Sequence, residues 1–247
     1  MKLHFALLLF LPLLGISQNN LLNKIKKEVK NVNTDDFKKI TSNSNAIDIS
    51  AGLKEALNKG IEKQVTKLTA KDGFLKNKLV KIMLPSELKK VDETLRKFGF
   101  GSMADEGLII LNRAAEDAVK ESTPIFVEAV KNMSFTDAKK ILMGSENEAT
   151  SYLQTNTSSA LYSKFNPVVK NSFSKVGADK IWATIIKKYN TLPMVTKVNP
   201  DLTDYTTNKA LEGVFKMIAV EEKIIRTDLN SRSTTLLQNV FAIQDKK

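Results

Sequence analysis

The sequence predicts an all-α protein, with a single multi-helix, bundle-like domain of about eight helices after a cleaved signal peptide. Apolar residues recur every three or four positions, beginning with Leu53, Leu57 and Ile61, and this is the period of an amphipathic helix. No stretch of comparable length alternates apolar and polar residues as a half-buried strand does. The connections between the periodic segments are short, which favours antiparallel neighbours within one domain.

The first 18 residues have the layout of a secretory signal peptide. Lys2 is followed by an apolar run over 3–14 and then by the small residues Gly15 and Ser17. Because this run is shorter than the roughly 20 apolar residues of a spanning helix, we expect cleavage near residue 18, with an uncleaved anchor as the alternative. The expected location is therefore periplasmic or secreted. A lipoprotein is not expected, because the sequence has no cysteine to carry the lipid.

Three regions are expected to follow one another along the chain. The signal peptide (1–18) precedes a polar, lysine-rich N-terminal arm (19–47), which we interpret as either mobile or a loosely docked helix. Residues 48–243 form the expected all-helical domain. Two lobes hinged at Gly144 are the alternative arrangement of that domain.

The first four helices are expected at 50–68, 86–98, 103–121 and 124–132. The first carries the leucine stripe and has its stop signal at Gly73, since glycine is frequent just after a helix end. The second lies between Pro85 and the glycines that begin at Gly99. The third follows Ser102-x-x-Asp105, which has the spacing of a capping box.

The later helices are expected at 135–142, 146–175, 178–190 and 202–226, with a short terminal one at 234–242. Ser134-x-x-Asp137 is a second capping box, and Gly144 and Gly177 mark helix ends. We expect the long segment 146–175 to be broken near Asn156 or Pro167, because proline cannot donate the hydrogen bond of a helix interior.

Histidine and cysteine are absent from the expected mature chain, since the only histidine, His4, lies in the signal peptide and there is no cysteine. This composition excludes Ser-His-Asp and Cys-His catalysis, zinc sites built from those residues, haem with a histidine ligand, and disulfides. No cofactor and no metal site are expected. An EF-hand starting at Asp201 is rejected, because Thr206 occupies the position of the required glycine.

Net charge is +11, or +10 after loss of Lys2, which leaves 37 basic and 27 acidic residues. For an exported protein, this surplus favours an anionic envelope component as the partner, either a lipid headgroup or a cell-wall polymer. Nucleic acid is not expected, because the few aromatic residues are not interleaved with the lysines. A merely solvated lysine-rich surface is the alternative interpretation.

A candidate polar cluster is expected on two helices. The spacing of Asp105, Asn112 and Glu116 places them on one face of the helix 103–121, with Arg113 at the edge of the core, where it needs a carboxylate partner. We expect that partner to be Glu221 or Glu222 across two packed helices. Glu222 and Arg226 are also spaced as an i,i+4 pair within the last long helix. The network is either a structural set of ion pairs or an acid and base pair. The cluster comprises Asp105, Asn112, Arg113, Glu116, Glu221, Glu222 and Arg226.

Many short motifs occur in one order along the chain: NRAAE (112–116), PIF (124–126), DA-x-x-IL (137–142), AT-x-Y (149–152), F-x-P (165–167), DL-x-x-Y-x-T (201–207), AL-x-G-x-F (210–215) and EE-x-x-IR (221–226). With these motifs the chain, over about residues 48–241, resembles the domain of unknown function 4197 family of exported bacterial proteins. The resemblance implies an all-helical domain in the bacterial envelope. It implies no activity, ligand or catalytic residue.

Two functional hypotheses follow. The first is an exported, non-enzymatic binding or structural protein of the bacterial cell envelope, which acts through a basic surface on an anionic component or on a protein partner. The alternative is a carboxylate-dependent hydrolase that uses acidic residues near Arg113. The alternative requires at least two acidic side chains in a cleft that solvent can reach.

Overall fold

The computed structural model describes residues 34–97, 99, 101–191, 197, 199 and 201–245. The predicted signal peptide and residues 19–33 of the predicted arm lie outside the described residues. The chain divides into two compact units, Met1–Asn45 and Ala46–Lys247. The packing described below belongs to the second unit.

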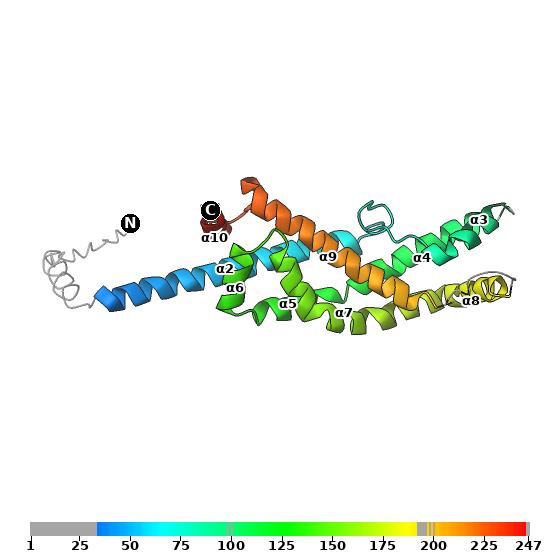
Figure 1. Cartoon of the computed structure of the whole chain (residues 1–247), viewed down its shortest axis with the longest axis horizontal. Coiled ribbons are helices and arrows are strands. Elements are labelled where there is room, and N and C mark those ends of the chain that lie inside the picture. The colour runs from blue at the N-terminus through cyan, green and yellow to red at the C-terminus, as the bar shows by residue number, and fades with distance from the viewer. Residues whose placement is uncertain are drawn as a thin grey trace, which may run out of the picture. The chain divides into compact units, whose positions relative to one another are not determined.

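The all-α class is confirmed: the described residues contain nine α-helices and two short 3-10 helices, and no strand (Figure 1). Each predicted helix is present with ends that differ by a few residues, except that the first begins at Thr34 and therefore includes part of the predicted arm. No described helix is both long and apolar enough to cross a membrane. In chain order the elements are α2 (Thr34–Thr69), η1 (Ser86–Leu88), α3 (Lys89–Lys97), α4 (Gly101–Val119), α5 (Ser122–Lys131), α6 (Phe135–Met143), α7 (Glu148–Lys175), α8 (Ala178–Tyr189), α9 (Thr203–Thr227), η2 (Leu229–Ser231) and α10 (Thr235–Gln244).

The core lies where α4, α7 and α9 pack against one another, with α5 added against α7. Fully buried Ala114, Ala115 and Ala118 of α4 face this core, and their small side chains let α4 approach its neighbours closely. The rings of Phe126 and Phe215 meet edge to face, with centroids 5.9 Å apart, a favoured aromatic geometry. The core therefore joins helices that are far apart in the sequence.

The predicted break in the long helix is wrong, because α7 continues through Pro167. Proline removes the hydrogen bond to the carbonyl of Ser163, but both residues are exposed, so water can satisfy that carbonyl. On the opposite face Phe165 and Val169 are fully buried. Burial on either side of the proline thus holds the helix together.

The alternative of two lobes hinged at Gly144 is also wrong, since the residues on both sides of it belong to the same compact unit. Helix α6 ends next to Gly144, and α7 begins four residues later and packs against it. The capping box predicted at Ser134 is confirmed, with its hydroxyl accepting from the Asp137 backbone N–H.

Candidate functional site

Apart from Asp105, the members of the predicted polar cluster fall into three separate sets of contacts. Asp105 is the outermost member: it is exposed and accepts a 2.7 Å hydrogen bond from Arg96. Because Arg96 lies in the last turn of α3 and Asp105 begins the second turn of α4, this pair joins two consecutive helices. It takes no part in the three other sets, whose cluster members are buried except for the half-buried Arg113.

Asn112 fastens the connection between α2 and η1 to the middle of α4. Its side chain is fully buried, and its Oδ1 accepts from the N–H of Ile82 at 2.8 Å while its Nδ2 donates to the carbonyl of Ile82 at 2.9 Å. A second bond from Nδ2 reaches the carbonyl of Leu108 at 2.7 Å. Asn112 therefore satisfies both backbone hydrogen-bonding groups of Ile82, as a neighbouring β-strand does in a sheet.

Glu116, one helical turn further on, holds the start of the same connection. Its Oε1 accepts from the N–H of Phe74 at 3.1 Å, and its Oε2 accepts from Arg113 Nη1 at 2.6 Å. Arg113 also donates from Nη2 to Asp72, a residue in the left-handed region with φ of 72°. The motif Asn-Arg-x-x-Glu thus clamps residues 70–85.

The predicted pairing of Arg113 with Glu221 or Glu222 is wrong. Its partners come from its own helix and from the connection that follows α2, because these groups lie directly beside the guanidinium. The hydrogen bond with Glu116 raises the pKa of Arg113. The pKa of Asp72 is lowered mainly by its hydrogen bond with Lys76, and next by its hydrogen bond with Arg113. Both shifts favour the charged forms of Arg113 and Asp72.

The predicted i,i+4 pair of Glu222 and Arg226 is confirmed, with Arg226 Nη2 2.8 Å from Glu222 Oε1. Both side chains are buried, and each also binds the end of another helix. Glu222 accepts from the N–H groups of Ala149 and Thr150 in the first turn of α7, at 2.9 and 2.8 Å. The anion thus meets the positive end of the α7 dipole.

Arg226 makes the complementary contacts at the end of α6. Its Nη2 donates to the carbonyl of Ile141 at 2.8 Å, and its Nη1 donates to that of Leu142 at 3.3 Å. The Ile141 carbonyl also accepts from the Gly144 N–H at 3.3 Å. The last carbonyls of a helix lack partners within it, and the negative end of the helix attracts a cation. A single ion pair on α9 therefore secures both helix ends on either side of Gly144.

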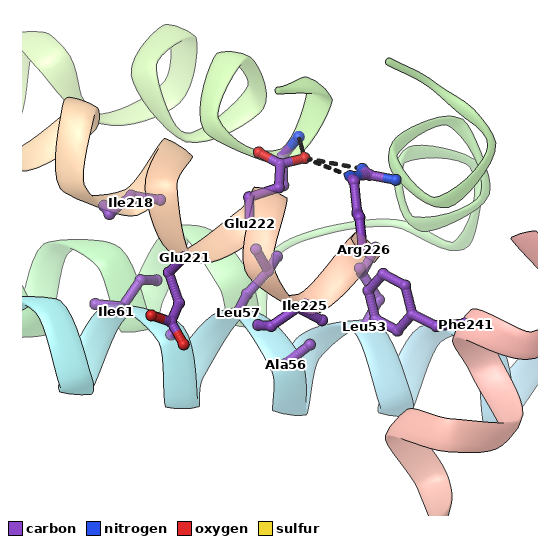
Figure 2. A pocket seen from close by; sticks show the side chains of 12 residues that line it. Leu53, Ala56, Leu57, Ile61, Ile218, Glu221, Glu222, Ile225, Arg226 and Phe241 are labelled. Atoms are coloured by element: carbon purple, nitrogen blue, oxygen red, sulfur yellow. Dashed lines mark hydrogen bonds and ion pairs between the residues drawn. The ribbon is translucent and has the colours of Figure 1, made fainter. Parts of the chain in front are cut away.

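Glu221 points away from Glu222 and toward α2 (Figure 2). Its carboxylate accepts from Lys63 Nζ and from Gln64 Nε2, each at 2.6 Å. The approach is close at Gly60, where an added Cβ would lie 3.3 Å from Glu221 Cγ. This third contact set joins α9 to the part of α2 within the second unit.

A small cavity lies between these contacts, with a volume of about 30 Å³, enough for about one water molecule. Apolar side chains dominate its lining, as Figure 2 shows for Leu57, Ile61 and Phe241. The cavity is therefore too small for a substrate or cofactor.

The buried carboxylates are fully engaged, which counts against the carboxylate-dependent hydrolase. Glu116, Glu221 and Glu222 are each at most 9% exposed, and both oxygens of each accept hydrogen bonds. An acid or base catalyst must reach a substrate proton, and these groups instead bind backbone N–H groups and the side chains of neighbouring residues. Nor do the described residues contain three acidic side chains arranged to hold a metal ion.

The clamped connection presents a surface that the sequence analysis did not single out. Phe74, Val80 and Ile82 are buried, whereas Leu79 and Met83 are 49% and 54% exposed. They border a shallow depression of about 280 Å³ against α9. The exposed Glu212 also lines this depression. We define the loop patch as its exposed or half-buried apolar and basic residues together with Tyr205: Leu79, Lys81, Met83, Tyr205, Lys209 and Lys216.

A family model described as protein of unknown function (DUF4197) matches residues 43–242. This match confirms the resemblance carried by the ordered motifs, and it extends over the second unit. No curated protein and no solved structure matches the chain. The motif residues Asn112, Arg113, Glu116, Glu222 and Arg226 are those that fasten the connection 70–85 and the ends of α6 and α7.

Proposed function

Since the chain belongs to the DUF4197 family of proteins of unknown function, we propose a function from its surface: it is an exported, non-enzymatic protein that binds anionic lipid headgroups of the bacterial envelope through the loop patch. The observation that carries this proposal is a fastened connection that exposes two apolar side chains among lysines.

The apolar part of the loop patch consists of Leu79 and Met83, both about half exposed. Between them, Val80 and Ile82 point inward and are buried, so the two outward side chains occupy the exposed side of the connection. Surfaces that enter the headgroup region of a bilayer combine exposed apolar side chains with nearby cations. A cell-wall polymer offers less hydrocarbon for such side chains, which favours lipid.

The basic part of the loop patch is formed by Lys81, Lys209 and Lys216. Lys209 is paired with Glu212 at 2.6 Å, whereas Lys81 and Lys216 have no ion-pair partner among the described residues. Unpaired lysines contribute about 1 kcal/mol each near an anionic membrane. The net positive charge of the chain adds a longer-range attraction.

The connection 70–85 is held rigidly, which favours binding. The backbone of the connection is held by Glu116 near its start and by Asn112 near its end. Gly213 of α9 allows Phe74 to pack closely, since a Cβ at Gly213 would lie 2.6 Å from that ring. A surface that is already ordered loses little conformational entropy when it binds.

The expected affinity is modest. Half-burial of Leu79 and Met83 contributes about 1 kcal/mol each, and the two unpaired lysines contribute about 1 kcal/mol each. The sum, on the order of 4 kcal/mol, corresponds to reversible binding with a dissociation constant near the millimolar range of accessible lipid.

The test is sedimentation of the full mature chain with vesicles of phosphatidylcholine alone or mixed with phosphatidylglycerol. We expect retention on the anionic vesicles only, with weaker retention as salt increases. Lys81→Gln with Lys216→Gln should weaken binding about thirtyfold, from two lysines at about 1 kcal/mol each. Leu79→Ser with Met83→Ser should weaken it similarly.

Matched controls replace side chains of the same kind outside the loop patch. Lys139 and Lys175 are exposed, and Val176 and Leu229 are 56% and 65% exposed. Changing these lysines to Gln, or these apolar residues to Ser, should leave binding within about twofold of the wild type, since surface changes elsewhere contribute little. Equal losses in the controls, or binding that salt does not weaken, would refute the proposal.

Export is tested separately by cell fractionation and mass spectrometry of the mature protein. Cleavage near residue 18 and recovery outside the cytoplasm are the expected results. Full-length protein recovered from the cytoplasm would refute export, and with it the proposed binding of envelope lipid.

A further inference from the structure

A groove of about 910 Å³ lies between α5 and α7, two helices that pack side by side (Figure 1). Ile125 and Ala129, four residues apart, line the α5 wall, and residues at every fourth position over 152–164 line the α7 wall. At about 1.5 Å per residue, that wall is about 18 Å long. The hydroxyl of Tyr152 donates to the carbonyl of Ala129 at 3.4 Å and joins the two walls.

The charge of the groove is opposite to that of the molecule. Glu121, Glu128 and Asp137 line it together with a single cation, Lys164, whereas the whole chain carries a net charge of +11. A positively charged protein therefore presents a locally acidic groove.

The acidic side chains differ in how far they are already engaged. Glu121 has no side-chain partner among the described residues. Glu128 accepts from the exposed Asn132 amide at 2.9 Å and lies 3.7 Å from the exposed Lys131. Asp137 is committed to the capping box of α6. Glu121 and Glu128 are thus the carboxylates that a ligand can recruit, because weak exposed pairs exchange easily.

We propose that the α5–α7 groove binds a cationic amphipathic helix of a partner protein. Apolar side chains repeated every three or four residues along such a helix would lie against Ile125, Ala129 and Ala160, and its flanking lysines or arginines would face Glu121 and Glu128. The wall length corresponds to about three helical turns. An anionic ligand would be repelled, and a neutral helix would leave the carboxylates uncompensated.

This inference does not depend on the proposed function. The loop patch takes an anionic ligand through lysines of the connection 70–85 and α9, whereas the groove takes a cationic ligand through Glu128 of α5 and Glu121 just before that helix. Variants of one surface should leave binding at the other unchanged, so the two proposals fail separately.

The experiment measures fluorescence anisotropy of a labelled synthetic helix of about 14 residues, made of leucine and lysine with helical spacing. A matched peptide carries glutamate in place of lysine. Both are titrated with the full mature chain at about 0.02 M and about 0.3 M salt, which brackets strong and weak screening. We expect binding of the lysine peptide at low salt and none of the glutamate peptide.

Three variants locate the binding. Glu121→Lys with Glu128→Lys should weaken binding at least about tenfold, because attraction becomes repulsion at two sites. Ala160→Trp should weaken it comparably by filling the groove without changing charge. Glu62→Lys with Glu106→Lys, at exposed positions outside the groove, changes net charge by the same amount and should leave affinity within about twofold.

Two outcomes would overturn the proposal. Equal loss in the two charge-reversal pairs would mean that only net charge matters. Unchanged binding in Ala160→Trp, verified as folded by circular dichroism, would mean that the peptide lies elsewhere. Because Ala160 and both pairs of glutamates are exposed, the variants are expected to fold.

Discussion

Replacing Asn112 by alanine should release the connection 70–85 from α4 before the surrounding helices unfold. The side chain is fully buried and makes hydrogen bonds to both backbone groups of Ile82, which is itself only 2% exposed. Alanine cannot replace either bond. The N–H and the carbonyl of Ile82 would be left buried without partners.

The size of the effect follows from those two groups. An unsatisfied buried donor or acceptor costs about 1–3 kcal/mol, so the pair costs about 2–6 kcal/mol if the connection stays in place. The lost bond to the Leu108 carbonyl adds little, since that carbonyl lies within a helix. If local opening of the connection costs less free energy than burying the two unpaired groups, the connection opens, and the free energy of opening then sets the measured loss of stability. We expect a loss of about 3 kcal/mol.

Two measurements separate these cases. Urea unfolding gives the change in the free energy of unfolding, and hydrogen exchange reports the protection of the Ile82 amide. The matched control is Asn208→Ala, because Asn208 is exposed and its Nδ2 also bonds to a carbonyl one turn earlier, at Asp204. That control should change stability by less than about 0.5 kcal/mol.

An Asn112→Ala protein that unfolds like the control and keeps the Ile82 amide protected would show that Asn112 does not hold the connection in place. A folded Asn112→Ala protein with fast exchange across 70–85 should also bind anionic vesicles less tightly, since the loop patch is then no longer ordered in advance. Unchanged vesicle binding in that protein would show that rigidity does not contribute to the proposed function.

Other predictions concern the buried ion pair and the C-terminal helix. Arg226→Met should lower the free energy of unfolding by about 3–5 kcal/mol, because Glu222 is left as a buried charge. Arg96→Met, at an exposed pair, should lower it by less than about 1 kcal/mol. Urea unfolding measures both losses, and equal losses would contradict this difference between buried and exposed pairs. The hydrogen bond from Arg232 lowers the pKa of Asp245 below its ordinary 3.8. Its stabilising contribution is therefore present above pH 3.8 and is lost as pH falls through the folded pKa. Asp245→Asn should accordingly flatten the decline of melting temperature with acid, and an unchanged decline would contradict this assignment.

Local patterns in the sequence were sufficient for the helices and for one ion pair. The three-to-four residue period predicted the helices because side chains at that spacing share one face. Glu222 and Arg226 were predicted to pair for the same reason, since they lie one turn apart. For residues 34–47 the sequence did not decide between a mobile arm and a loosely docked helix, because the polar run over 41–45 interrupts the apolar pattern.

Partners that are distant in the sequence were not predictable in this way. Arg113 pairs with Asp72, 41 residues earlier, in a connection whose backbone follows no period. Its position depends on the buried contacts of Phe74 and Ile82. The lysines and apolar residues over 76–83 mark a surface only once the contacts of Glu116 and Asn112 with this connection are known.

The helical class, the family, the absence of cysteine chemistry and the surplus of positive charge could all be read from the sequence, because each depends on composition, local period or ordered motifs. The fastening of the connection by Asn112, Arg113 and Glu116, and the binding of the ends of α6 and α7 by Glu222 and Arg226, became visible only in the folded chain. Those roles depend on which backbone groups lack partners after the helices pack. Helix packing is set by contacts across the whole chain, and it also decides which lysines and carboxylates remain at the surface for a ligand.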